Sequence, residues 1–275
     1  MNEIFNQMMS LYRREGADGE RNALYEVMQQ IVLCGLYRGG FFNEAAFYGG
    51  TCLRIFYGLK RYSEDMDFSL LTKNPDFSLE KYFPAIIEEA RLLGRDIVIT
   101  KKNKKNFSRV ESAFLKDNTD VYNLTFATDK TLKIKIEVDI DPPLGFKTEQ
   151  KLLMLPFSFN ARCMVLSDLY AGKMHALVFR QWKNRIKGRD WYDFEWYVRN
   201  RIPLDFKHLQ ERAREFNNIE LTKDDFVRML KERFAKADIR QAKEDVLPFI
   251  ENVHELDIWS NEYFIQLCDM IVFEG

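Results

Sequence analysis

Two aspartates separated by one residue, Asp65 and Asp67, have the types and the spacing best suited to chemistry in this sequence. They lie in a stretch from Arg61 to Leu70 in which polar and apolar residues alternate, as in a β-strand. Such a strand places both carboxylates on one face, where like charges repel each other unless a cation lies between them. We therefore predict a metal site at these two aspartates.

The residues before this strand are suited to holding a phosphate. Gly49 and Gly50 predict a turn, Thr51 can cap a short helix, and Gly58 can end that helix. Backbone N–H groups in such a turn and at the start of a helix attract anions. A phosphate site next to the metal site is therefore our hypothesis for this stretch.

A second acidic strand is expected at 131–141, joined by a turn at 128–130 to an antiparallel strand at 121–127. Its charged residues share one face: Lys133, Lys135, Glu137, Asp139 and Asp141. A sheet face open to solvent has the same pattern, so these residues become informative only beside Asp65 and Asp67. One further carboxylate would complete an oxygen-rich magnesium site. Glu137 is the first choice for this ligand and Asp139 the second.

The rest of the chain predicts mainly helices. Apolar periodicity predicts helices at 22–37 and at 79–93, the second ended by Gly94, and a strand at 96–100. A loop is expected at about 142–162. Helices are expected from there almost to the end: 168–182 capped by Ser167, one starting at Asp190, 222–237 with Thr222 and Asp225 as a capping box, 239–250 and 261–273.

Two basic stretches are candidates for contact with nucleic acid. The run at 101–109, KKNKKNFSR, is expected to be a solvated hairpin loop, with phosphate contact as the alternative. The second stretch surrounds Trp182 with Arg180, Lys183, Arg185, Lys187 and Arg189. It predicts either a groove that meets phosphates or a helix end whose macrodipole favours cations.

Composition limits the class of protein. The 275 residues suffice for one large domain or two smaller ones, and a net charge of −1 argues against a globally basic nucleic-acid coat. Four distant cysteines without a CxxC pair are expected to be reduced and to bind no zinc. The N-terminus lacks a signal-peptide pattern and no run of about 18 apolar residues occurs, so we expect a cytoplasmic protein without membrane contact. The histidine spacing supports no catalytic triad, and there is no P-loop.

Two blocks of this sequence are similar to one known family. The first block comprises Gly49-Gly50-Thr51, Arg54 and Arg61-Tyr62-Ser63-Glu64-Asp65-Met66-Asp67-Phe68. The second comprises Ser167-Asp168-Leu169-Tyr170-Ala171-Gly172-Lys173, His175-Ala176-Leu177, Arg180 and Lys187-Gly188-Arg189-Asp190-Trp191-Tyr192-Asp193. With the acidic strand between them, the two blocks resemble the AbiEii/AbiGii toxin family of the nucleotidyltransferase superfamily over more than half of the chain.

This resemblance implies an α+β fold, in which a minimal nucleotidyltransferase-type mixed β-sheet with helices is followed by a helical C-terminal region. We expect a nucleotidyltransferase core domain at 1–160 and a helical domain at 161–275 that contributes Lys173 and Asp190 to the site. Family members transfer a nucleotide from an NTP with magnesium, some of them to the 3′ end of tRNA, and are usually encoded with an antitoxin. The expected cofactor is therefore Mg²⁺, as two ions. The expected partners are an NTP, tRNA or another RNA, and a cognate antitoxin.

The resemblance also assigns roles to residues. Asp65 and Asp67 would be catalytic metal ligands, with Glu137 as the first choice for the third. Lys173 would bind phosphate, and Asp190 would act near the nucleophile or orient Lys173, supported by Asp193. The nucleotide-binding candidates are Gly49, Gly50, Thr51, Arg54, Ser63 and Lys173. Two other functions stay open: nucleotidyl transfer to a small molecule or a protein, and non-catalytic binding by a protein with the same fold.

Overall fold

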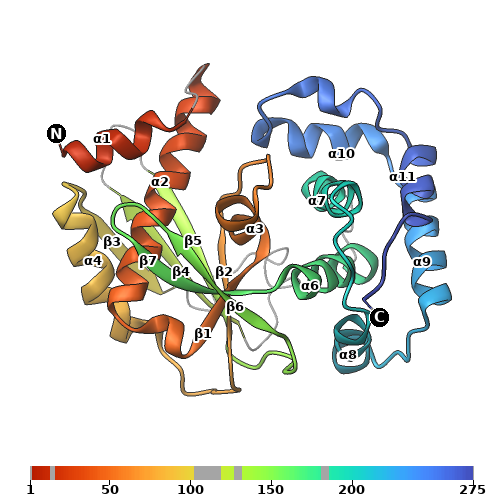
Figure 1. Cartoon of the computed structure of the whole chain (residues 1–275), viewed down its shortest axis with the longest axis horizontal. Coiled ribbons are helices and arrows are strands. Elements are labelled where there is room, and N and C mark those ends of the chain that lie inside the picture. Colours follow the sequence, from red (N-terminus) through yellow and green to blue (C-terminus); the bar gives the residue numbers. More distant parts are fainter. Residues whose placement is uncertain (1, 13–15, 102–118, 127–131, 181–185, 275) are drawn as a thin grey trace. The chain divides into compact units, whose positions relative to one another are not determined.

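The computed structural model describes residues 2–12, 16–101, 119–126, 132–180 and 186–274. The chain divides into two compact units, each described by itself below (Figure 1). The sheet unit comprises Met1–Gly58, Tyr62–Leu144 and Thr148–Cys163. The helical unit comprises Leu59–Arg61, Gly145–Lys147 and Met164–Gly275. Two short segments that lie between stretches of the sheet unit in the sequence thus belong to the helical unit.

A mixed seven-stranded sheet, in the order β3-β4-β5-β2-β1-β7-β6, forms the sheet unit. The strands are β1 (Ala45–Tyr48), β2 (Met66–Leu70), β3 (Ile97–Lys101), β4 (Thr119–Phe126), β5 (Leu132–Asp139), β6 (Thr148–Leu153) and β7 (Phe159–Met164). β2 is antiparallel to β1 and parallel to β5, so it lies between them in the middle of the sheet. The predicted α+β fold with a mixed sheet is confirmed.

Within the described residues, four helices accompany this sheet: α1 (Glu3–Ser10), α2 (Gly16–Arg38), α3 (Gly49–Tyr57) and α4 (Phe83–Leu92), with short 3-10 turns at Phe41–Asn43 and Leu79–Tyr82. α2 packs against α1 and α4, and α3 packs against β1 and β2. The core is largely aromatic, and the rings of Phe47 and Phe68, on neighbouring strands, stack with centroids 4.9 Å apart. On β5 the buried Ile134, Ile136 and Val138 alternate with charged residues, as the sequence predicts.

The helical unit contains α6 (Leu166–Phe179), α7 (Gly188–Arg199), α8 (Phe206–Asn217), α9 (Lys223–Lys236), α10 (Ile239–Val246) and α11 (Asn261–Cys268), with 3-10 turns at Leu247–Phe249 and Val253–Leu256. Its core gathers aromatic rings from three helices: Trp191 lies 4.6 Å from Phe234 and 4.7 Å from Phe264, centroid to centroid. The expected helical C-terminal region is confirmed. Among the described helices, none is long and apolar enough to cross a membrane.

The prediction of one continuous loop at about 142–162 is wrong, because β6 lies within this range and β7 begins in it. β6 is the last strand of the sheet, and its side chains are half-buried or exposed. An edge strand of this kind carries too few buried apolar residues to produce a clear alternation in the sequence.

The strand expected from Arg61 begins only at Met66. The carbonyl groups of Ser63, Glu64 and Asp65 accept hydrogen bonds from side chains, which takes the place of strand pairing there. Arg61 belongs to the helical unit. The part of the predicted strand that precedes Met66, which includes Asp65, is therefore wrong.

Helix ends were predicted with mixed success. α3 begins at Gly49 and α6 at Leu166, neither with a side-chain cap, so Thr51 and Ser167 lie inside their helices. The Thr222 cap is confirmed, because Thr222 Oγ1 accepts the Asp225 N–H at 3.0 Å. α6, α10 and α11 end earlier than expected, at Phe179, Val246 and Cys268. The expected turn at 128–130, most of the basic run at 101–109, and Trp182, Lys183 and Arg185 lie outside the described residues.

Candidate functional site

The first part of the site lies where β1 leads into α3. Tyr48 at the end of β1 pairs with Asp67 on β2, and α3 starts at the next residue, Gly49. Gly49 has φ +80°, and a Cβ atom there would lie 2.2 Å from Asp67 Oδ2. Only glycine fits both conditions. The Asp67 carboxylate therefore lies at the N-terminus of α3, where the helix dipole favours negative charge.

Glu137 lies opposite Asp67. The two residues are partners in the parallel pairing of β2 with β5, and their side chains are both half-buried. The Lys135 Nζ atom lies 2.5 Å from Glu137 Oε1 and 3.9 Å from Asp65 Oδ2. One ammonium group thus contacts carboxylates from two segments that are far apart in the sequence.

The electrostatics of this group favour a cation. Burial lowers the pKa of Lys135, but the carboxylates of Asp65, Glu137 and Asp67 raise it by more, so the pKa is above its usual value. The Asp65 side chain is 46% exposed and the Glu137 side chain 22%. This acidic group is therefore partly open to solvent.

Asp139, the second choice for the third carboxylate, has a different environment. It pairs with Ser69, two residues beyond Asp67, and it is buried. Its Oδ1 atom accepts the N–H of Asp141 at 3.2 Å, as in a turn that ends a strand. The strand register therefore places Glu137, and not Asp139, opposite Asp67.

Three nucleotide-binding candidates of the sequence analysis have structural contacts. Arg54 Nε lies 2.8 Å from Glu26 Oε2, and its guanidinium lies over the Tyr62 ring. The Thr51 side chain is fully buried, and its hydroxyl donates to the carbonyl of Asp65. The carbonyl of Ser63 accepts from Gln29 Nε2 at 2.8 Å. Arg54 and Thr51 therefore support the site from within the protein, and the role of each toward a nucleotide stays a prediction.

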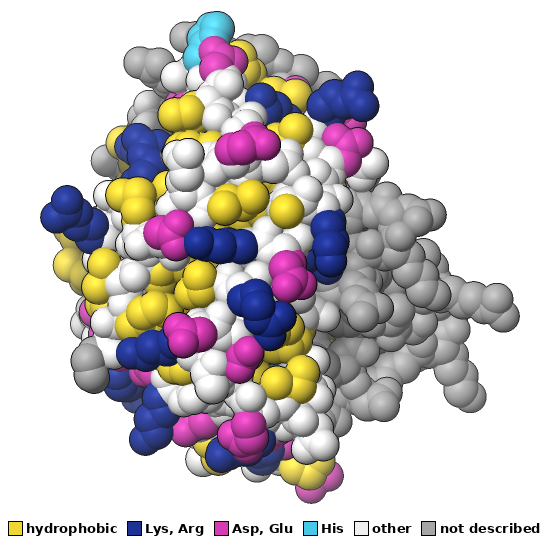
Figure 2. Space-filling model, turned by 90° about the vertical axis from the view of Figure 1, so that its right-hand side faces the viewer, with side chains coloured by type: hydrophobic (Ala, Val, Ile, Leu, Met, Phe, Trp, Pro, Cys, Tyr) yellow, Lys and Arg dark blue, Asp and Glu magenta, His cyan; other side chains and the backbone are white. Residues whose placement is uncertain are grey.

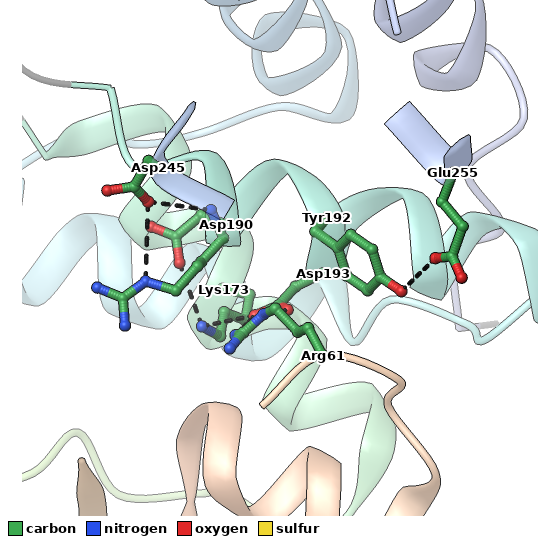
Figure 3. Close-up of polar contacts among 8 residues, drawn as sticks. Arg61, Lys173, Asp190, Tyr192, Asp193, Asp245 and Glu255 are labelled. Carbon is green, nitrogen blue, oxygen red and sulfur yellow. Dashed lines mark hydrogen bonds and ion pairs between the residues drawn. The ribbon is translucent and has the colours of Figure 1, made fainter. Parts of the chain in front are cut away.

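The second group of predicted site residues lies in the helical unit (Figure 3). Lys173 on α6 has its Nζ atom 3.1 Å from Asp190 Oδ1 and 2.7 Å from Asp193 Oδ2, both on α7. Asp190 and Asp193, three residues apart on α7, share one helix face. Arg61 binds Asp193 in a bidentate manner, with distances of 2.6 Å and 2.7 Å. Two cations and two carboxylates are thus paired among almost fully buried side chains.

Charge pairing in this cluster outweighs burial. Burial raises the pKa of Asp190, but the ammonium groups of Lys187 and Lys173 lower it by more, so it is well below its usual value. Burial likewise raises the pKa of Asp193, and Arg61 and Lys173 lower it by more. A carboxyl group with such a low pKa is a weak base. The geometry of Asp190 therefore fits the orientation of Lys173 better than proton abstraction.

A cavity of about 660 Å³ opens beside this cluster within the helical unit. Asp190 and Lys187 line it together with apolar side chains, among them Leu177, Trp191 and Met229. Asp190 raises the pKa of Lys187, but burial and the neighbouring cations lower it by more, to about 8. The volume is in the range of small-molecule sites.

The described basic residues form no single-sign surface on the face drawn in Figure 2, where Lys and Arg side chains alternate with Asp and Glu. On α9, Arg228 pairs with Asp225 and Glu232, and Lys231 pairs with Asp269 on another segment. Of the expected basic stretches, Lys101 at the end of β3 pairs with Asp120. RNA contact through these stretches stays a prediction.

A separate acidic group was not predicted from the sequence. Carboxylate oxygens of Asp168, Asp205 and Glu274 lie within 4.8 Å of one another. The Lys147 Nζ atom lies 3.2 Å from Asp205 and 2.9 Å from Glu274, and the Lys147 N–H donates to Asp168. The ammonium of this lysine compensates part of the negative charge of the group, which joins the segment 145–147 to α6 and α8.

Sequence reasoning gave no role to two residues of the first group, Lys135 and Gln29. The sequence analysis places Lys135 on the same strand face as Glu137. Residues two apart on a strand are neighbours on one face, so this spacing already indicated that the ammonium could contact the carboxylate. Gln29 is one of two adjacent glutamines in an apolar part of α2. A buried amide there must find a hydrogen-bond partner, and this was the signal that was missed.

Comparison with known proteins identifies the family of this chain. The model of the family "Nucleotidyl transferase AbiEii toxin, Type IV TA system" (toxin–antitoxin system) matches residues 31–264. Among solved structures, the chain matches JHP933 from Helicobacter pylori with a TM-score of 0.50 and 18% identity, covering 91% of this chain and 90% of that chain. It also matches a candidate nucleotidyltransferase from H. pylori with a TM-score of 0.48 and 18% identity, covering 90% of this chain and 91% of that one. A comparison with curated proteins finds no match.

Replacing Asp193 with alanine should lower the free energy of unfolding by about 3–5 kcal/mol, because buried Arg61 and Lys173 then lose a shared partner. Urea unfolding measures this change. Asp269→Ala removes the exposed pair with Lys231 and should cost less than about 1 kcal/mol. If both variants lowered the free energy of unfolding by the same small amount, the buried cluster would not contribute the stability that we expect.

The Asp168 carboxyl group should make stability depend on pH. Burial raises its pKa to about 6, so the folded protein holds this proton more tightly than the unfolded chain. The resulting stability is present below about pH 4 and is lost as the pH rises through about 6. Asp168→Asn should therefore raise the free energy of unfolding by about 1–3 kcal/mol at pH 8 and much less at pH 4.

Thermal or urea unfolding at the two pH values tests the Asp168 prediction. Asp76→Asn, at an exposed position, is the control and should change stability equally at both pH values. A gain for Asp168→Asn that is as large at pH 4 as at pH 8 would show that another group is responsible.

Proposed function

Because this chain belongs to the AbiEii family of nucleotidyl transferase toxins of type IV toxin–antitoxin systems, we propose that it transfers a nucleotide from an NTP to the 3′ end of tRNA in a magnesium-dependent reaction. The observation that supports this most is that the Lys135 ammonium contacts the carboxylates of Asp65 and Glu137, while the strand pairing places Asp67 opposite Glu137. The proposed reaction takes place in the cytoplasm, and a cognate antitoxin controls it.

The acidic group fits magnesium. Carboxylate oxygens are the ligands that Mg²⁺ prefers, and the Lys135 ammonium marks the place where the fold stabilises positive charge. We propose Asp65, Asp67 and Glu137 as the ligands of two ions. Bound Mg²⁺ would supply positive charge to the phosphate oxygens and to the acceptor hydroxyl.

The residues around this group would bind the triphosphate. The turn at Gly49 and Gly50 begins α3, and the free N–H groups of such a helix start attract phosphate. Because the Asp67 carboxylate lies directly against Gly49, a phosphate bound at this helix start would lie next to the acidic group. Arg54 and Ser63 are retained as further nucleotide-binding candidates.

We propose that Lys173 acts on the triphosphate and that Asp190 and Asp193 orient it. Their distances of 3.1 Å and 2.7 Å from Nζ support this orienting role. The cavity lined by Asp190 and Lys187 has the volume and the mixed apolar and charged walls that a nucleotide requires. The low pKa of Asp190 leaves proton transfer from the acceptor to another group or to solvent.

The choice of tRNA as acceptor rests on the family resemblance and on the basic stretches at 101–109 and 180–189. With a net charge of −1, RNA binding must depend on local groups of cations. Binding through phosphates is sensitive to salt, which distinguishes RNA from a small-molecule or protein acceptor.

Replacing Asp67 with asparagine should reduce magnesium-dependent transfer by at least about 100-fold while the fold is retained, because a ligand charge is lost. The assay incubates the protein with each of four α-³²P-labelled NTPs and purified tRNA, at low and at high salt. Asp76→Asn is the control and should retain full activity. Circular dichroism reports the fold of both variants.

Label on tRNA that disappears with Asp67→Asn would support the proposed reaction. Label on protein or on a small molecule instead would assign a different acceptor. Transfer that is unchanged in Asp67→Asn would contradict the metal site, and the lack of transfer to any acceptor would favour a non-catalytic binding protein.

Lys135→Met should strengthen Mn²⁺ binding by about tenfold, because the ammonium of Lys135 competes for the same carboxylates. Isothermal titration with Mn²⁺ measures this affinity without a nucleotide. Lys133→Met is the matched control, since Lys133 is exposed on the same face of β5. Weaker Mn²⁺ binding in Lys135→Met than in Lys133→Met would contradict this prediction, because it would show that Lys135 favours metal binding and does not compete with the metal.

A further inference from the structure

The chain reaches Asp65 without the support of strand pairing. β2 begins at Met66, and the preceding residues form neither a helix nor a strand. The Asp65 side chain is 46% exposed, and the contact recorded for its carboxylate among the described residues is with Lys135 at 3.9 Å. The place of this carboxylate is therefore determined mainly by the main chain that carries it.

This main chain is held by two side chains from other elements. Gln29 Nε2, from the middle of α2, donates to the carbonyl of Ser63 at 2.8 Å and to that of Glu64 at 3.1 Å. The hydroxyl of Thr51, from the first turn of α3, donates to the carbonyl of Asp65. Three consecutive carbonyl groups thus have side-chain donors where a strand would have backbone donors.

Both donors are fixed in place by burial. Gln29 is 1% exposed and Thr51 is 0% exposed. The amide nitrogen of Gln29 carries two hydrogens and has two carbonyl acceptors, so its hydrogen-bonding capacity is used completely. A buried donor of this kind has no water to replace its partners.

The next residue of α2 shows that this arrangement is specific to Gln29. Gln30 is also buried, at 8% exposure, but its Nε2 atom donates to Tyr12 Oη at 2.7 Å. Two adjacent glutamines with similar burial thus serve different parts of the sheet unit. Of these two glutamines, Gln29 is the one that donates to the segment carrying Asp65.

We propose that Gln29 and Thr51 are positioning residues for the cation site, an inference that rests on the proposed function of Asp65 as a metal ligand. They hold Ser63, Glu64 and Asp65 so that the Asp65 carboxylate meets the same cation as Glu137. Thr51 thereby acts through its buried hydroxyl on the metal-binding segment, whereas the sequence suggested a helix cap.

The experiment compares Gln29→Met with Gln30→Met. Methionine is close to glutamine in length and lacks the amide donor, so both variants replace one buried amide in the same helix. Isothermal titration with Mn²⁺ alone should show at least about tenfold weaker binding for Gln29→Met and little change for Gln30→Met. Equal weakening in both variants, or none in Gln29→Met, would overturn the proposal.

A second pair of variants covers the case in which Gln29→Met does not fold. Thr51→Val has nearly the size of threonine without the hydroxyl, whereas Thr51→Ser keeps the hydroxyl. Mn²⁺ affinity should fall by about tenfold in Thr51→Val relative to Thr51→Ser. Equal affinities in this pair would contradict the role of the Thr51 hydroxyl.

Hydrogen exchange of the metal-free protein, followed by mass spectrometry, provides a readout that does not depend on the metal. Peptides covering 61–66 should exchange faster in Gln29→Met than in Gln30→Met. Faster exchange with unchanged Mn²⁺ affinity would reduce Gln29 to a structural role and overturn the proposal. If the unmodified protein bound no Mn²⁺, the proposed metal site itself would fail together with this inference, whereas tight binding that Gln29→Met leaves intact would overturn the inference alone.

Discussion

Repulsion between neighbouring carboxylates is the main physical constraint on the candidate site of the sheet unit. Asp67 and Glu137 face each other on adjacent parallel strands, and Asp65 contacts the same ammonium group as Glu137. The fold compensates this negative charge in two ways. The ammonium of Lys135 lies between two of the carboxylates, and the N-terminus of α3 lies against Asp67 at Gly49. The proposed metal site needs the same concentration of oxygen ligands, so the carboxylates that repel each other are also the ones on which the proposed function depends.

In the helical unit, neighbouring carboxylates are compensated by an equal number of cationic side chains that contact them directly. Arg61 and Lys173 carry two positive charges, and Asp190 and Asp193 carry two negative charges, all in a cluster that is almost fully buried. A buried ion of this kind is tolerated only with a partner at hydrogen-bond distance. The acidic group of the sheet unit is different, since its carboxylates are partly open to solvent. The closed pairing in the helical unit fixes its side chains in position, whereas the partly open acidic group of the sheet unit leaves room for a ligand.

The sequence predicted those elements whose signals are local. The alternation on β5, the glycine that ends α3 and the Thr222 cap were read correctly, because each depends on residues within one element. The caps at Thr51 and Ser167 failed although both residue types are good caps. Thr51 instead bonds Asp65 from inside its helix, so a distant partner overrode the local preference. β6 was missed because an edge strand has little buried apolar surface to reveal it.

The sequence by itself determined the two aspartates, the glycine turn before them, the acidic face of β5 and the family to which these blocks belong. The tertiary structure decided which groups meet. The strand register selects Glu137 as the residue opposite Asp67, and Gln29 reaches the carbonyl of Ser63 across 34 residues of sequence. The physical reason is that local patterns reflect periodicity and capping within one element, whereas pairing between strands and burial of a polar side chain depend on how separate elements pack together.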